Sequence, residues 1–502
     1  MSDQRTDMGD EPRPAEGESE SLARKAGGGF VWALAGFLLL QLGSFGTYSV
    51  ASRVLDERIG VVAAAMTVVF WIDVLLDLGM GAALIYEQEE GQSERVQVAF
   101  TVNAVVATTL SLSVLIGAPV LDSFFRAGDP NLFRVIAVLV LAKGLNQVPD
   151  ALLKRELAFQ RRARADFTRS ILRFTIATSL LLAGVGPIAM VSAAAIAEVC
   201  AVSVTWWLVR FRPRLRFDRR IAVEMLRFGG AVFGARLVGM LWLNGDYLVV
   251  SRHFGSKSRE FSSYFTAFRL PELILGSVYN LFSSVAFPTF SKARDMGAEK
   301  LRDSSLKALR MLCLFGFPVG AALSLIARDF ITVWFGGSFS DAIRPMELLG
   351  AVGGFAAIGF ASGDVYAAIG KPRLGLYFTL VGAPILIGGF LAVVDHGIVA
   401  VAVVHMAVIV PYSLFRIEVA NRLLGTTWRQ SLSALRPAAV TVAGIVALAL
   451  PVRLGTTHAG IVPLVAIVAA GVAGAVGGLA LGDRATLRQL AGLGSGAVAR
   501  FR

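Results

Sequence analysis

Charged residues are scarce in this chain: Asp, Glu, Lys and Arg make up 17% of its 502 residues, whereas 55% are hydrophobic. Soluble domains carry about 25% charged residues, because charge keeps their surface in water. The mean hydropathy of +0.65 points the same way. The composition therefore excludes a soluble globular protein and predicts an integral membrane protein.

Cysteine is almost absent, and so are the motifs of enzyme chemistry. Cys200 and Cys313 both lie in apolar runs, which excludes a disulfide framework and indicates buried packing residues. The sequence has no phosphate-binding Gly-Lys loop, no paired metal-ligand motif and no nucleophile elbow. We therefore expect no enzyme activity and no cofactor, so energy must come from an ion gradient or from consumption of the product outside.

Apolar runs of membrane-spanning length recur from Gly27 almost to the C-terminus. A helix needs about 20 such residues to cross the bilayer. Two pairs of runs are separated only by minimal turns, at Gly186-Pro187 and Asp395-His396. We predict fourteen spans, over residues 27–51, 60–84, 97–121, 132–152, 167–187, 188–209, 227–251, 264–288, 306–327, 342–369, 373–394, 397–416, 435–452 and 460–481.

The distribution of Lys and Arg predicts the orientation, because basic residues near helix ends stay on the cytoplasmic side. With the N-terminus inside, ten of the 48 basic residues fall in outward loops and 35 on the cytoplasmic side. The richest inward segments are Lys154 to Arg173, Arg210 to Arg227 and Lys292 to Arg310. We expect both termini to be cytoplasmic. The net charge of +12 then reflects the excess of basic residues on the cytoplasmic side, where they can contact anionic lipid headgroups. It implies no nucleic-acid partner.

An internal repeat divides the chain. Thr47 to Leu55 (TYSVASRVL) and Asp246 to Phe254 (DYLVVSRHF) share Tyr, Val, Ser and Arg in register, about six spans apart. Such a match suggests that the first six helices and the next six are parallel repeats. The predicted parts are a disordered cytoplasmic tail without signal-peptide features (1–25), an N-lobe (26–209), a basic cytoplasmic linker (210–226), a C-lobe (227–417), an accessory helix pair (418–482) and a cytoplasmic tail (483–502).

Several short segments carry a family resemblance. They are DLG (Asp77 to Gly79) with AALI (Ala82 to Ile85), VPDALLKRELAF (Val148 to Phe159), FGG (Phe228 to Gly230), NGDYLVV (Asn244 to Val250) and AFPTFS (Ala286 to Ser291). With them the chain resembles, over roughly Lys25 to Arg429, polysaccharide exporters of the Wzx type, within the multidrug/oligosaccharidyl-lipid/polysaccharide superfamily.

The resemblance implies an all-α membrane protein with two six-helix lobes around a central cavity, plus an accessory C-terminal helix pair. It implies a flippase in the bacterial cytoplasmic (inner) membrane, working by alternating access. The substrate would be an undecaprenyl-diphosphate-linked oligosaccharide, moved to the outer leaflet for capsule, exopolysaccharide or lipopolysaccharide biosynthesis. Pathway partners would be glycosyltransferases and a polysaccharide polymerase. In the lipid II flippase of this superfamily an extra helix pair forms a groove for the lipid tail, which suggests the same role here.

Charged residues inside the spans are candidates for substrate contact, because each costs at least about 2.5 kcal/mol at membrane depth. Arg236 lies some nine residues into its span, where its guanidinium fork could hold a diphosphate. Lys143 is the second candidate. The alternative for Arg236 is a structural salt bridge to Glu198 or Asp246. Arg269 is a third candidate, although its spacing of three from a glutamate also predicts a local ion pair.

Acidic residues in the spans are candidates for ion coupling. Asp73 and Asp77 are four residues apart on one helix face, so one of them would tend to hold a proton. That arrangement suits proton coupling, whereas the alternative is an ion pair with Lys143. Asp246 is a further coupling candidate. Three more buried candidates have no partner that the sequence identifies, namely Glu198, Asp364 and His405.

Two other functions remain open. A drug or cation antiporter of the same superfamily would need a net acidic cavity, and the mixture of buried charges does not exclude one. The VPDALLKRELAF segment favours the saccharide exporters. A membrane-embedded glycosyltransferase or polymerase would need a sizeable external loop, but the longest outward loop, near Ser256 to Ser263, is short.

Overall fold

The computed structural model describes residues 41, 43–76, 92–156, 158–210 and 212–488. Throughout these residues the regular elements are helices, as expected for an all-α membrane protein. Ten of the described helices are long and apolar enough to cross a membrane. The chain is therefore a multi-pass membrane protein.

The difference between ten and the fourteen predicted spans has a physical cause. Gly43–Leu76 counts once, although the short helix η1 (Asp56–Arg58) interrupts it between two predicted spans. Three further predicted spans fall on helices outside this count. Two of them, α6 (Phe159–Leu182) and α8 (Arg219–Phe254), are too polar, and in the third α9 has only 13 residues and is separated from α10 by a π-helical turn. The number fourteen stays a prediction.

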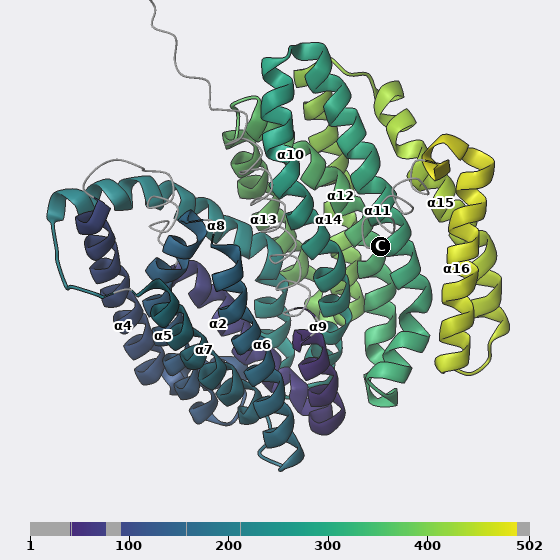
Figure 1. Cartoon of the computed structure of the whole chain (residues 1–502). Helices are drawn as coiled ribbons and strands as arrows, with labels where there is room; N and C mark the ends of the chain where they lie inside the picture. The colour runs from purple at the N-terminus through teal and green to yellow at the C-terminus, as the bar shows by residue number, and fades with distance from the viewer. Residues whose placement is uncertain (1–40, 42, 77–91, 157, 211, 489–502) are drawn as a thin grey trace, which may run out of the picture.

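The N-lobe is the bundle of helices at one side of Figure 1. It comprises the helix over residues 43–55, α2 (Ile59–Leu76), α4 (Gln92–Phe125), α5 (Pro130–Arg155), α6 and α7 (Ile188–Val209). The predicted minimal turn after α6 is present. Gly184 and Gly186 adopt φ of 80° and 83° there, a region that glycine tolerates and other residues rarely enter.

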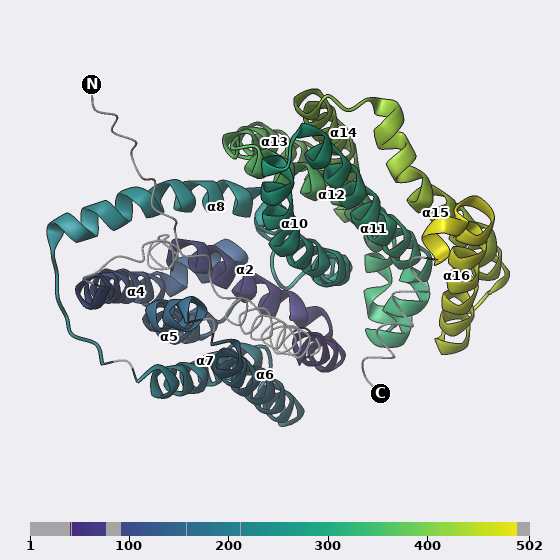
Figure 2. The same ribbon diagram turned by 45° about the horizontal axis from the view of Figure 1, so that its top comes forward.

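The C-lobe includes the second bundle, which runs from teal to green in Figure 1. It comprises α8, α9 (Arg259–Pro271), the π-helical turn η2 (Glu272–Gly276), α10 (Ser277–Asp295), α11 (Ala298–Trp334), η3 (Gly337–Ala342), α12 (Ile343–Ala368), α13 (Arg373–Val393), η4 (Val394–His396) and α14 (Ile398–Leu424). Figure 2 shows α8 running as a long arm from beside α4 to the C-lobe. The predicted span 264–288 falls on α9, η2 and α10, so its helix is interrupted by a π-helical turn.

The accessory pair is α15 (Trp428–Gly455) and α16 (Ile461–Gly482), which pack on α11 away from the N-lobe (Figure 1). Their backbones nearly touch: a Cβ atom at Gly444 would lie 2.0 Å from the carbonyl oxygen of Gly474. Close approach of this kind needs small residues and is typical of helix pairs in membranes.

The two lobes are joined at one end by hydrogen bonds, which we call the interlobe seam. The Ser262 hydroxyl on α9 donates to the carbonyl of Glu57 (2.6 Å) and accepts from the amide of Gly60 (3.1 Å). Arg53 donates to the carbonyl of Trp334 at the end of α11 (2.9 Å). The seam lies at the end of the molecule that the basic-residue distribution assigns to the outside.

Labelling of introduced cysteines can test this orientation. In a chain with Cys200 and Cys313 replaced by alanine, Thr457→Cys between α15 and α16 should react with an impermeant maleimide in intact cells. Lys300→Cys, in the first turn of α11, should react only after permeabilisation. Both positions are exposed. Labelling of Lys300→Cys in intact cells would reverse the predicted orientation.

A basic cavity in the N-lobe as the candidate functional site

A cavity of about 650 Å³ lies among the N-lobe helices and is bordered by α8 and α9 of the C-lobe. Its lining has seven basic and four acidic residues, a formal charge of +3. The basic residues are Lys143, Lys154, Arg162, Arg169, Arg173, Arg236 and Arg269, and the acidic ones are Asp73, Asp150, Asp166 and Glu198.

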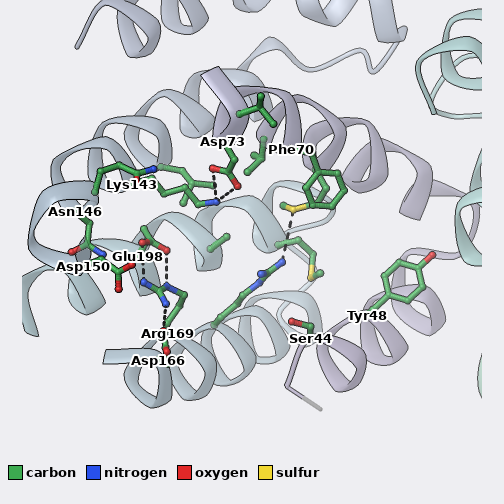
Figure 3. Close-up of a pocket in the computed structure, with 18 of the residues that line it drawn as sticks. Ser44, Tyr48, Phe70, Asp73, Lys143, Asn146, Asp150, Asp166, Arg169 and Glu198 are labelled. Atoms are coloured by element: carbon green, nitrogen blue, oxygen red, sulfur yellow. Dashed lines mark hydrogen bonds and ion pairs between the residues drawn. The ribbon is translucent and has the colours of Figure 1, made fainter. Parts of the chain in front are cut away.

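The first ion pair of the cavity joins α5 to α2. The Lys143 ammonium lies 2.6 and 2.8 Å from the two carboxylate oxygens of Asp73 (Figure 3). This is the ion pair that sequence analysis weighed against proton coupling. Asp77, the other member of the predicted acidic pair, lies outside the described residues.

Arg169 of α6 makes the most extensive contacts in the cavity. Its guanidinium donates two hydrogen bonds to Glu198 of α7, at 2.8 and 3.2 Å, and one to Asp166 at 2.6 Å (Figure 3). Glu198 is almost fully buried, so it needs a charged partner. The bidentate geometry fixes the orientation of α6 against α7.

The last acidic residue, Asp150 of α5, also has basic partners. It accepts from Arg162 at 2.9 Å and from Lys154 at 2.6 Å. Each of the four cavity carboxylates is therefore paired with a basic residue of the lining. The positive charge that the cavity has in excess comes from additional arginines.

These additional arginines are Arg173, Arg236 and Arg269. Arg269 binds Glu272 at 3.0 Å, and Glu272 lies outside this lining, in the wall of a neighbouring cavity. Arg173 lies close enough to Arg269 for the two guanidinium groups to repel each other. Its Nε atom is buried without a hydrogen-bond partner among the described residues. A cluster of arginines in a lining where basic residues exceed acidic ones attracts anions.

Three of these residues, Arg162, Arg169 and Arg173, were not among the predicted contact residues, because Lys154 to Arg173 was counted as a basic inward segment. In the structure most of this segment is helical, since α5 ends at Arg155 and α6 begins at Phe159. Arg162, Arg169 and Arg173 are spaced by seven and four residues, which places them on one helix face. This periodicity was the signal that could have identified a cavity-lining helix.

The structure brings three predicted contact residues, Arg236, Lys143 and Arg269, into the lining of one cavity together with Asp73. The two salt-bridge partners considered for Arg236 are engaged elsewhere. Glu198 binds Arg169, and Asp246 lies in a separate buried cluster.

The separate cluster joins α8, α9 and α14 inside the C-lobe. The Tyr264 hydroxyl donates to Asp246 at 2.8 Å, and the His405 Nε2 atom lies 3.3 Å from the same carboxylate oxygen. All three side chains are buried. The second oxygen of Asp246 and the Nδ1 atom of His405 have no hydrogen-bond partner among the described residues. The sequence could not pair His405, because its partners lie more than 140 positions away.

Asp364, the remaining buried candidate, accepts a hydrogen bond from Ser283 at 2.9 Å. Within the described residues, no group of three or more His, Cys, Asp or Glu side chains could hold a metal ion.

Comparison with known proteins places this chain among polysaccharide biosynthesis proteins. The sequence profile of the family described as "polysaccharide biosynthesis protein" matches residues 50–344. The teichuronic acid biosynthesis protein TuaB of Bacillus subtilis is 25% identical over 77% of this chain and 80% of its own length. The succinoglycan biosynthesis transport protein ExoT of Rhizobium meliloti is 24% identical over 62% of this chain and 64% of its own length.

Solved structures show the same fold. The lipid II flippase MurJ, in an inward closed conformation, superposes with a TM-score of 0.72 over 91% of this chain and 99% of its own, at 14% identity. A multidrug transporter of the MATE family, inward-facing, gives a TM-score of 0.60 over 79% of this chain and 99% of its own, at 18% identity. The predicted superfamily resemblance is confirmed at the level of the fold.

Proposed function

Because this chain belongs to the polysaccharide biosynthesis protein family, we propose that it is a flippase for undecaprenyl-diphosphate-linked oligosaccharides. It moves them from the cytoplasmic to the outer leaflet of the bacterial inner membrane, for capsule, exopolysaccharide or lipopolysaccharide biosynthesis. Glycosyltransferases of the same pathway supply the substrate, and a polymerase consumes the product.

The observation that carries this proposal is the +3 formal charge of the N-lobe cavity. A diphosphate brings at least two negative charges and several acceptor oxygens, which arginine forks bind in pairs. We assign Arg173, Arg236 and Arg269 to the diphosphate, because they bring guanidinium donors from α6, α8 and α9 to one cavity. Lys143, paired with Asp73, has a supporting role.

Alternating access accounts for the position of the seam. The cavity lining extends to Lys154 and Arg162, near the end of the helices that we assign to the cytoplasm. The seam of Ser262 with Glu57 and Gly60 closes the opposite end. A substrate would enter from the cytoplasm, and opening of the seam would release it outside.

The antiporter alternative fits this cavity less well. A site for cationic drugs needs an excess of carboxylates, but each carboxylate here is matched by a basic residue, and arginines remain in excess. A cation would be repelled from such a lining.

Reconstitution tests the proposed function directly. The full chain in proteoliposomes should move undecaprenyl diphosphate bearing a saccharide between leaflets, measured by accessibility of the sugar to an external glycosidase. Liposomes carrying an unrelated membrane protein are the control. Equal rates with and without this chain would refute the flippase function.

For ion coupling we propose Asp246 in preference to Asp73. Asp246 shares a buried site with His405 and Tyr264, where protonation would change the local charge without breaking an ion pair to lysine. Arg269 and Glu272 are also close, since both interact electrostatically with the neighbouring Tyr247. Asp73 is held by Lys143 and would have to leave that pair before it could carry a proton.

Paired variants distinguish the two carboxylates. Asp246→Asn should remove most of the stimulation of flipping by an imposed proton gradient, while flipping without a gradient continues. Asp73→Asn should keep the stimulation ratio and lower the rate in both conditions, because it leaves the Lys143 charge unpaired. Loss of the stimulation in Asp73→Asn alone would assign the coupling to the N-lobe instead.

A further inference from the structure

A second cavity, of about 460 Å³, is lined mainly by C-lobe residues of α8, α9, η2, α10, α12 and α14, and also by Gln41. Arg269 lines this cavity as well as the basic one, so the two share a wall. The second cavity differs in character, because aromatic and aliphatic side chains predominate in its lining. Pockets with a mainly apolar wall and a few placed polar groups are typical of small-molecule sites.

The most prominent aromatic pair in its wall is Trp242 of α8 and Tyr412 of α14. Their ring centroids are 4.4 Å apart, with 33° between the ring planes. The Trp242 ring is supported from behind by α13: a Cβ atom at Gly382 would lie 2.7 Å from the indole and 3.1 Å from the Tyr412 ring. The missing side chain at Gly382 thus leaves room for a fixed aromatic platform.

Arg416 of α14 adds a second arginine to the lining of this cavity, beside Arg269. Its guanidinium lies 5.5 Å from the centre of the Tyr412 ring and 5.9 Å from that of Tyr366. Its Nε atom is buried without a hydrogen-bond partner among the described residues, while the guanidinium interacts with the Tyr366 side chain and with the Asp364 carboxylate. Gly359 and Gly363 of α12 leave space for it: a Cβ atom at Gly363 would lie 2.6 Å from one terminal nitrogen.

We propose that this C-lobe cavity holds the saccharide next to the diphosphate. The inference rests on the proposed flippase function. A pyranose ring presents an apolar face of C–H groups, which suits an aromatic platform, and an edge of hydroxyl groups, which suits a guanidinium donor. Trp242 and Tyr412 supply the platform, and Arg416 supplies the donors.

Arg269 gives the two cavities a common point. A diphosphate held by Arg269 on the N-lobe side would direct its sugar–phosphate bond toward the shared wall, so that the first sugar enters the C-lobe cavity. The polyprenyl chain is a poorer occupant. It offers no acceptor to Arg416 and would leave that guanidinium buried beside hydrocarbon, which is costly.

Binding measurements with two probes test the subsite. Undecaprenyl diphosphate carrying one hexose, as the glucose or the galactose derivative, is compared with unsubstituted undecaprenyl diphosphate on the full chain in nanodiscs. We expect tighter binding of a hexose derivative. Trp242→Ala should reduce this preference by about three- to tenfold, the range of single aromatic contacts, without changing the affinity for the unsubstituted lipid.

Further variants act as controls. Trp242→Phe should retain most of the preference, and Arg416→Gln should reduce it. Trp428→Ala changes an exposed tryptophan on α15, outside both cavities, and should leave the affinity for every probe unchanged.

Each remaining outcome decides against one of the two proposals. If the wild-type chain binds no undecaprenyl diphosphate, the flippase function fails. If it binds the substituted and unsubstituted lipids equally, or if Trp242→Ala weakens both by the same factor, the saccharide subsite fails. A uniform loss in Trp242→Ala would assign the cavity to the lipid chain.

Discussion

Replacement of Arg236 by alanine is expected to abolish most of the saccharide-lipid flipping at normal membrane abundance. The residue lines the cavity in which basic residues exceed acidic ones. A hydrogen bond to a charged group contributes about 1.5–3 kcal/mol, which corresponds to roughly ten- to a hundredfold in affinity. Binding of undecaprenyl diphosphate should weaken by that factor.

Conservative and matched variants make this prediction specific. Arg236→Lys should give an intermediate affinity, because the charge remains but the two-pronged geometry is lost. Arg269→Ala should behave like Arg236→Ala. Arg219→Ala, on the exposed first turn of the same helix α8, should leave binding unchanged. An Arg236→Ala chain with wild-type affinity for undecaprenyl diphosphate would remove the residue from the site.

Double variants test the remaining structural role for Arg236. If it only neutralised a buried carboxylate, Glu198→Gln or Asp246→Asn would restore flipping to Arg236→Ala. We expect no rescue, because Glu198 is bonded to Arg169, and Asp246 to Tyr264 and His405. Removal of either carboxylate would instead disturb those pairs.

Replacement of Gly60 by valine is expected to open the interlobe seam and stop export. A Cβ atom at Gly60 would lie 2.3 Å from the carbonyl oxygen of Ser256 and 2.6 Å from the Ser262 hydroxyl. The first contact is with backbone, so α2 and the turn between α8 and α9 must separate. Overpacking of this kind costs about 1–3 kcal/mol, enough to shift a two-state equilibrium roughly fivefold to a hundredfold toward the outward-open state.

A cavity cysteine reports the shift. Val62 lines the N-lobe cavity two residues from Gly60, and it is buried. In the background without Cys200 and Cys313, Val62→Cys should react with an impermeant maleimide from outside much faster when Gly60→Val is also present. Membrane abundance of the two chains is compared to exclude misfolding.

A milder change at the seam provides a second readout. Ser262→Ala removes the hydrogen bonds to Glu57 and Gly60 but adds no bulk, so it should increase outside labelling less than Gly60→Val does. If neither variant increases labelling of Val62→Cys, the seam does not act as the gate.

Much of the architecture was predictable because it follows from local sequence patterns. Hydrophobic runs of membrane-spanning length identified the helices. Gly186 marked a tight turn, because its φ of 83° lies in a region that residue types other than glycine rarely adopt. The ion pair of Lys143 with Asp73 was one of two interpretations that the sequence allowed, the other being proton coupling by Asp73. A buried charge needs a partner in a membrane, and few candidates exist.

The sequence by itself determined the class of protein, the helices that apolar runs define, and the presence of charges at membrane depth, since all three follow from residue hydropathy along the chain. Only the tertiary structure decided which charges share a cavity. A basic amphipathic helix such as α6 has the composition of a solvated loop, and the packing of α6 on α7 turns Arg169 inward. Likewise, the contacts of His405 and of Trp242 join helices distant in sequence, so their partners depend on helix rotation and register, which local patterns do not encode.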